Sequence, residues 1–135
     1  MKAEKFQFDE SHSTTGLNGY DPVAYFTTGD AARGSGHHVT VFDGVTYLFS
    51  SEENKKSFDA QPERYLPAYG GFCAYGASVG KKFVGDPQVW KIVGGKLYLA
   101  LDRDIQSLWL QDIPGHVRQA DTNWIRIKSI PPAQL

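Results

Sequence analysis

The chain has 135 residues, a formal net charge of −1 and a single cysteine. The length fits one domain with one core, and the near-zero charge argues against nucleic acid or an anionic membrane as the main partner. One cysteine excludes an intrachain disulfide and any zinc site built from two or more cysteines of one chain. No stretch approaches the ~20 apolar residues of a membrane span, and residues 1–10 contain no apolar signal core. A cytoplasmic location is therefore expected, with a processed periplasmic form as the alternative.

In chain order, residues 1–15 are predicted to form a polar N-terminal arm, residues 16–126 the folded domain, and residues 127–135 a C-terminal tail. No linker, low-complexity segment or internal repeat is evident in the sequence. The sequence therefore predicts a single domain.

A first β-hairpin is predicted where residues 38–42 and 45–49 flank an Asp-Gly dipeptide, a strong signal for a two-residue turn. The pairs expected across this turn are Phe42 with Val45, Thr40 with Tyr47, and His38 with Phe49. A helix should follow, because Ser50 and Glu53 fit a capping box and Phe58 would be its inward anchor. Pro62 ends that helix near Gln61.

A second hairpin is predicted from residues 89–93 and 96–101 around a Gly-Gly turn. Two helices then close the chain, the first with an apolar stripe from Ile105 to Ile113, the second with Asp112 as its N-cap and Pro114 in its first turn. Together these elements predict an α+β fold, in which two β-hairpins form a small antiparallel sheet packed by several short helices in a single domain.

Two motifs, Gly19-Tyr-Asp-Pro-Val-Ala-Tyr-Phe26 and Tyr69-Gly-Gly-Phe-Cys-Ala-Tyr75, make the chain resemble the YHS-domain proteins. The resemblance extends in consistent order over roughly residues 16–125. Its other segments are residues 47–54, 62–65, 90–93, 96–99 and 121–124, with Phe58. It is closest to the longer, free-standing branch of the family.

For short YHS modules the resemblance implies a role in metal binding. The metal-associated pattern has a cysteine directly after Asp-Pro-Val and further cysteines after the aromatic strand. Here those positions read Ala24, Ser50 and Ser51. The family's metal role therefore does not transfer to them, and any metal would need other ligands.

Cys73 and His38 are the predicted metal ligands. A thiolate suits a soft ion such as copper or zinc, and His38 falls on the aromatic face of the first hairpin with Tyr47 and Phe49. One cysteine cannot hold a metal alone, so a second chain or a partner would complete the site. The alternatives are a small buried hydrophobic residue for Cys73 and an ordinary surface histidine for His38.

The aromatic residues Tyr47, Tyr69, Phe72 and Tyr75 are candidates for lining a pocket that binds a cofactor or a small organic ligand. Core and rim packing is the alternative for all of them. Asp21 is predicted to cap the turn that follows it, in preference to acting as a carboxylate ligand.

These observations favour a small soluble YHS-type module that binds or senses a transition metal ion, copper or zinc, without catalysis. One alternative is a metal-free accessory domain whose aromatic pocket docks a protein partner or a small organic ligand. A second alternative is a redox or enzymatic role of the Cys73 thiol. Known catalytic signatures are missing from the sequence, so no catalytic residue is assigned. A homodimer or a protein partner is expected, and nucleic acid and membrane are not.

Overall fold

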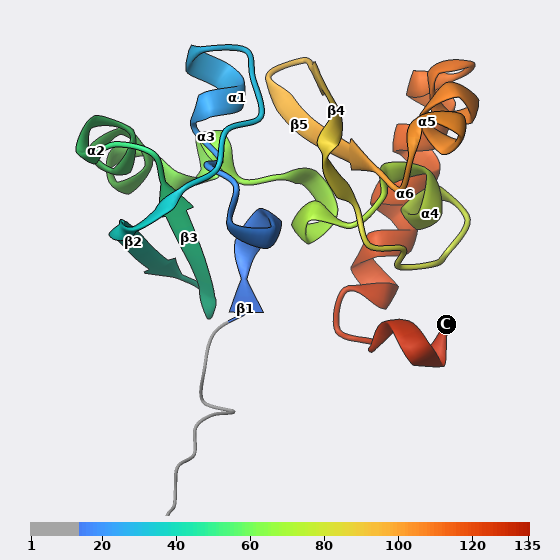
Figure 1. The fold of residues 1–135 in the computed structure, drawn as a ribbon. Helices are drawn as coiled ribbons and strands as arrows, with labels where there is room; N and C mark the ends of the chain where they lie inside the picture. The colour runs from blue at the N-terminus through green and yellow to red at the C-terminus, as the bar shows by residue number, and fades with distance from the viewer. Residues whose placement is uncertain (1–13) are drawn as a thin grey trace, which may run out of the picture. The chain divides into compact units, whose positions relative to one another are not determined.

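The computed structural model describes residues 14–135, which fall into two compact units divided between Pro62 and Glu63 (Figure 1). Each unit contains one of the two predicted hairpins. Most of the predicted arm, residues 1–15, lies outside the described residues. None of the helices in residues 14–135 has the length and apolar character that a membrane span requires.

The first unit is a three-stranded sheet with short helices. Its elements are β1 (Thr14–Thr15), the 3-10 turn η1 (Gly16–Gly19), α1 (Ala24–Thr27), β2 (Ser35–Phe42), β3 (Val45–Phe49) and α2 (Glu52–Ala60). The strand order is β1-β3-β2, with β1 parallel and β2 antiparallel to β3. The backbone therefore adds a parallel edge strand that the sequence pattern did not indicate.

The β2–β3 hairpin confirms the predicted turn and two of the three predicted pairs. Thr40 pairs with Tyr47, and Phe42 pairs with Val45. The expected pairing of His38 with Phe49 is wrong, because the register shifts between Ser35 and Val39 and places Ser35 opposite Phe49. An irregularity of this kind leaves strand residues without a direct partner, which moves His38 out of the regular ladder.

Helix α2 begins one residue later than a cap at Ser50 would require. The N-cap is Ser51, whose side chain accepts a hydrogen bond from the Asn54 backbone N–H at 3.1 Å. The predicted inward anchor is confirmed, because Phe58 is fully buried and its ring lies 5.2 Å from those of Tyr47 and Phe49. This aromatic contact fixes α2 against the sheet of the first unit.

The second unit holds a separate two-stranded sheet surrounded by helices. After α3 (Pro62–Tyr65), its elements are η2 (Ala68–Gly71), α4 (Ala74–Ser78), β4 (Asp86–Val93), β5 (Lys96–Ala100), α5 (Arg103–Leu110), α6 (Ile113–Ile127) and η3 (Pro132–Gln134). The β4–β5 hairpin turns at Gly94 and Gly95, as predicted. The α+β class is confirmed, but the two hairpins form two sheets instead of one.

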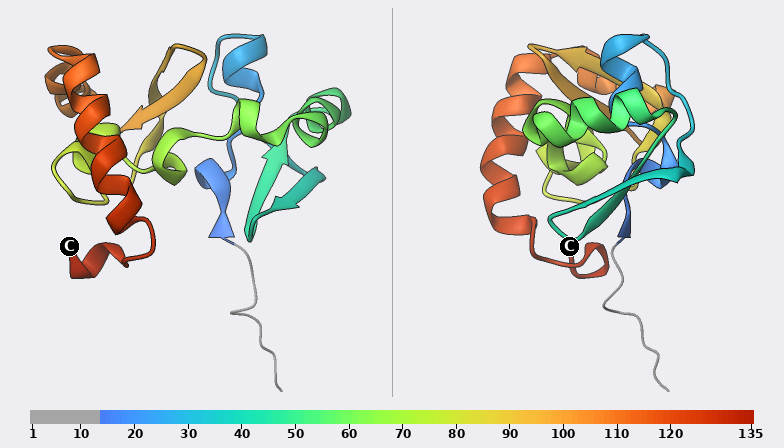
Figure 2. Two further views of the ribbon diagram at one scale, coloured as in Figure 1. Left: turned by 180° about the vertical axis from the view of Figure 1, so that it is seen from behind. Right: turned by 90° about the vertical axis from the view of Figure 1, so that its left-hand side faces the viewer.

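Helix α6 begins as the sequence predicts and packs along α4 within the second unit (Figures 1 and 2). Asp112 is its N-cap and accepts a hydrogen bond from the Gly115 N–H at 3.1 Å. Further along α6, the Asn123 side-chain amide donates to the backbone carbonyls of Ala77 and Ser78 at 3.0 and 3.1 Å. These bonds tie α6 to the carbonyls at the end of α4.

Candidate functional site

The buried carboxylate of Asp21 organises the first unit. Its side chain is fully buried. Oδ1 accepts hydrogen bonds from the backbone N–H groups of Val23 at 2.8 Å and Ala24 at 3.3 Å, which confirms the predicted capping role.

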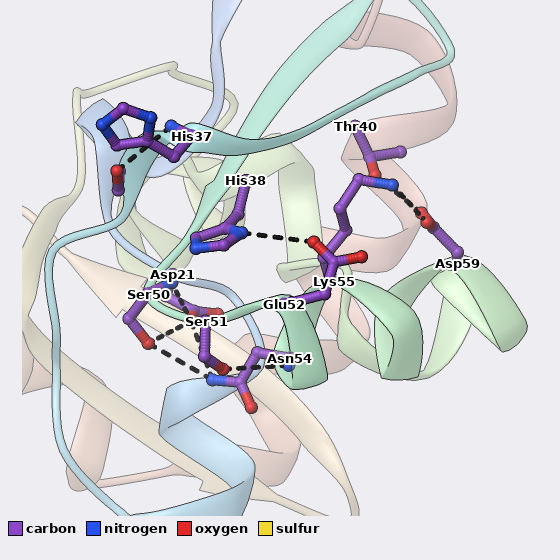
Figure 3. A network of polar contacts seen from close by, with 11 residues as sticks. Asp21, His37, His38, Thr40, Ser50, Ser51, Glu52, Asn54, Lys55 and Asp59 are labelled. Carbon is purple, nitrogen blue, oxygen red and sulfur yellow. Dashed lines mark hydrogen bonds and ion pairs between the residues drawn. The ribbon is translucent and has the colours of Figure 1, made fainter.

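The other oxygen of Asp21 connects α1 to the start of α2 (Figure 3). Oδ2 accepts from the Ser50 backbone N–H, the Ser50 hydroxyl and the Asn54 side-chain amide, each at 2.8 Å. A buried carboxylate is tolerated when hydrogen-bond donors surround it, and here two oxygens receive five bonds. Ser50 is committed to this carboxylate, which explains why Ser51 caps α2 in its place.

His38 lies beside Glu52 at an accessible edge of the same unit (Figure 3). His38 Nδ1 is 3.2 Å from Glu52 Oε1, and the two side chains are 28% and 56% exposed. His37 does not join them: its backbone N–H donates to the Ser35 hydroxyl at 3.1 Å, and its ring is turned elsewhere. The pair offers one imidazole and one carboxylate to solvent.

A second polar group joins β2 to α2 in the same region. Asp59 accepts from the Thr40 hydroxyl at 2.6 Å and from Lys55 Nζ at 2.8 Å. The hydrogen bond from Lys55, followed by the one from Thr40, lowers the pKa of Asp59 below its usual value. Asp59 thus remains a charged partner of Lys55 and is not free to ligate.

Cys73 lies in the second unit and is fully buried. It packs in a cluster with Val89, Ala100 and Ile105. Its Sγ accepts from the Gly76 backbone N–H at 3.4 Å, so it serves as the N-cap of α4. Cys73 and His38 belong to different units, and their pairing in one metal site stays a prediction.

The four predicted aromatic residues are divided between the units. Tyr47 belongs to the core of the first unit, where burial and then the charge of Asp43 raise its pKa. In the second unit, Tyr75 packs against the His116 ring at 5.2 Å. Tyr69 and Phe72 both contact Trp124, at centroid distances of 5.8 and 6.2 Å.

Two residues outside the predicted set complete the aromatic group of the second unit. Lys82 Nζ lies 5.4 Å from the Phe72 ring centroid and 5.2 Å from that of Trp124, within cation–π range. The Tyr69 hydroxyl donates to Asp121 Oδ1 at 2.9 Å. Burial of Tyr69, followed by this hydrogen bond, raises its pKa far above the usual value. No short-range pattern links Lys82 or Asp121 to the motif around Cys73.

No cluster of three or more histidine, cysteine, aspartate or glutamate side chains within residues 14–135 is arranged to hold a metal ion. The His38–Glu52 pair supplies two donors, whereas stable transition-metal sites generally use three or four ligands from protein or solvent. The described residues therefore do not form a complete metal site by themselves.

Residues 32–69 match the family model of the YHS domain. This match confirms the resemblance to the YHS-domain proteins. It covers the β2–β3 hairpin and α2, and hence His38, Glu52 and Asp59. Searches of curated proteins and of solved structures gave no match.

The positions that carry cysteines in the metal-associated YHS pattern meet around Asp21 in this chain. The Ala24 N–H and both donors of Ser50 bond the Asp21 carboxylate, and Ser51 adjoins them as the cap of α2.

Proposed function

We propose that the chain is a non-catalytic YHS-type binding module whose accessible site is the His38–Glu52 pair. The observation that supports this most is the 3.2 Å contact between a partly exposed imidazole and an exposed carboxylate inside the YHS-matched segment. Imidazole and carboxylate are common ligands of zinc and copper ions. The YHS match favours a transition metal ion as the ligand.

Because the pair offers only two donors, the remaining ligands would come from a partner protein or a second copy of the chain. Exposure of both side chains suits such a shared site, since an incoming group can reach them without unfolding the sheet. Cys73 is less suited, because burial encloses its sulfur and the Gly76 N–H already bonds it.

Equilibrium dialysis of the untagged full chain against Zn²⁺ tests this proposal. His38→Ala should abolish metal retention, while His37→Ala, the adjacent histidine with an exposed side chain, should preserve it. Cys73→Ala should also preserve it. Equal retention by the wild type and His38→Ala would overturn the proposal, and loss caused by Cys73→Ala would restore the predicted thiolate ligand.

A metal-free accessory module is the second candidate, and the aromatic group of the second unit favours it. Phe72 and Trp124 are partly exposed, and Lys82 lies over both rings. Such a group suits a planar or acidic partner. A thermal-shift screen with aromatic carboxylates would support this candidate if stabilisation disappears in Phe72→Ala, and would reject it if Phe72→Ala responds like the wild type.

A further inference from the structure

The two units share an unusual backbone turn before their first full helix. Three consecutive residues adopt positive φ in each: Leu17 (53°), Asn18 (51°) and Gly19 (88°) in the first, and Tyr69 (56°), Gly70 (62°) and Gly71 (86°) in the second. Leucine and tyrosine rarely adopt this conformation, because their side chains crowd the backbone. After each turn the same bond follows, from Tyr20 N–H to Leu17 O and from Phe72 N–H to Tyr69 O.

The two hairpins share strand register as well. In β2–β3, Ser35 pairs with Phe49, and the register then shifts so that Val39 pairs with Leu48. In β4–β5, Asp86 pairs with Ala100, and after the same shift Trp90 pairs with Leu99. Each of the four residues in β4–β5 lies 51 positions after the residue that corresponds to it in β2–β3, as Asp86 does after Ser35. A parallel pairing precedes each hairpin, Thr15 with Thr46 and Pro67 with Leu97.

Close packing of a glycine against a leucine also repeats at the spacing of 51 residues, with Gly34 against Leu48 and Gly85 against Leu99. A Cβ atom at Gly34 would overlap the backbone and Cβ of Leu48, and a Cβ atom at Gly85 would overlap Gly71 O and lie 2.8 Å from the Leu99 Cβ.

The aromatic pair that joins each hairpin to the next helix also repeats at a spacing of 51 residues. The Tyr47–Phe58 rings lie 5.2 Å apart at 41°, and the Tyr98–Trp109 rings lie 5.3 Å apart at 42°. Tandem copies of one module account for this repetition of backbone strain, register and packing.

We infer that residues 67–110 are a second copy of the module formed by residues 15–60, and that Cys73 holds in it the structural position of Asp21. The YHS match reaches only the beginning of the turn that opens this second copy, because it ends at Tyr69. Asp21 and Cys73 each donate their backbone N–H to the loop that follows the next helix, α1 or α4. The Asp21 N–H donates to Ala32 O at 2.7 Å, and the Cys73 N–H donates to Phe83 O at 2.8 Å.

The side chains at this position also do the same work. Asp21 Oδ1 accepts from the Ala24 N–H, and Cys73 Sγ accepts from the Gly76 N–H, three residues along in both cases. What differs is the surroundings. Leu101 and Ile105 stand at the positions of Ser50 and Asn54, so neither offers a side-chain donor, and Ile105 packs with Val89 and Ala100 in the apolar cluster of Cys73. An apolar environment excludes an ionised carboxylate and suits a thiol. Cys73 is therefore the cap of the second copy.

The second copy does not repeat the accessible donor pair of the first. Val89, which is buried, stands at the position of His38, and Arg103 stands at that of Glu52. The duplication itself is independent of whether the first copy binds a metal.

Transplanting the polar network of the first copy into the second tests this equivalence in the full chain. Cys73→Asp alone should lower the melting temperature by several degrees or prevent folding, because the carboxylate would be buried without donors. Adding Leu101→Ser and Ile105→Asn should raise the melting temperature or restore folding, measured by circular dichroism. In the Cys73 background the same pair of changes should lower it. A triple variant no more stable than Cys73→Asp would overturn the assignment.

A matched glycine pair gives a second, separate test. Gly34→Ala and Gly85→Ala should both destabilise the chain markedly, while Gly36→Ala, with no atom near its added Cβ, should leave the melting temperature nearly unchanged. If Gly85→Ala behaves like Gly36→Ala, the two hairpins are not equivalent and the inference fails.

Discussion

Replacing Asp21 by alanine should cost the chain a large share of its stability. The substitution removes one buried carboxylate and leaves five donor contacts without their acceptor. These donors belong to Val23, Ala24, Ser50 and Asn54. The substitution therefore loosens α1, the end of β3 and the first turn of α2 together.

The expected loss follows from the donors that the substitution leaves unpaired. A buried donor without its acceptor costs about 1–3 kcal/mol, and small domains have only about 5–15 kcal/mol in total. Urea unfolding monitored by tryptophan fluorescence and circular dichroism measures the change.

Asp59→Ala is the matched control. That carboxylate also accepts two side-chain hydrogen bonds, but it is solvent-exposed, so little change in stability is expected. A loss for Asp21→Ala no greater than that for Asp59→Ala would refute the role assigned to the buried network.

Three further predictions concern the second unit. The Cys73 thiol should react with a maleimide only as fast as the protein opens; labelling at the rate of a free thiol would contradict its burial. Because burial raises the pKa of Tyr69 in the folded chain, its contribution to stability is complete below the unfolded value near 10 and falls as pH rises above that value. The free energy of unfolding should therefore decrease above about pH 10 in the wild type, and should decrease less in Tyr69→Phe. Identical urea midpoints for both proteins above that pH would argue against the assignment. Asp112→Ala should remove the cap on the Gly115 N–H and cost about 1 kcal/mol, measured by urea unfolding, and an unchanged midpoint would show that α6 does not need the cap.

Short-range signals in the sequence were sufficient for the turns and for one helix start. The Asp-Gly and Gly-Gly pairs define both hairpins, and Asp112 with Pro114 defines the beginning of α6. In each case the deciding residues lie within a few positions of one another. Local backbone chemistry therefore determines these features.

Long-range contacts explain what the sequence did not predict. Ser50 looks like a helix cap until Asp21, 29 positions earlier, takes its hydroxyl and its N–H. The irregularity in β2 displaces His38 from Phe49, and no residue pattern in the strand indicates that shift. Both effects depend on contacts that form only in the folded unit.

The candidate site also combines a residue that the sequence predicts with one that only a long-range contact reveals. His38 was predicted as a ligand, but its neighbour Glu52 was not, since the contact joins a strand to the first turn of the next helix. The sequence does not reveal the duplication, because the few identical pairs, such as Gly34 with Gly85, are scattered among equivalent positions of different residue type. Leu17 corresponds to Tyr69, and Asp21 corresponds to Cys73.

Titration of the isotopically labelled full chain with Zn²⁺, followed by nuclear magnetic resonance of the histidine rings, tests the proposed binding site most directly. We expect the His38 ring signals to shift first, together with the Glu52 amide, and the ring signals of His37 and His116 to stay in place. Shifts confined to other residues, or no shift at millimolar zinc, would contradict the proposed site.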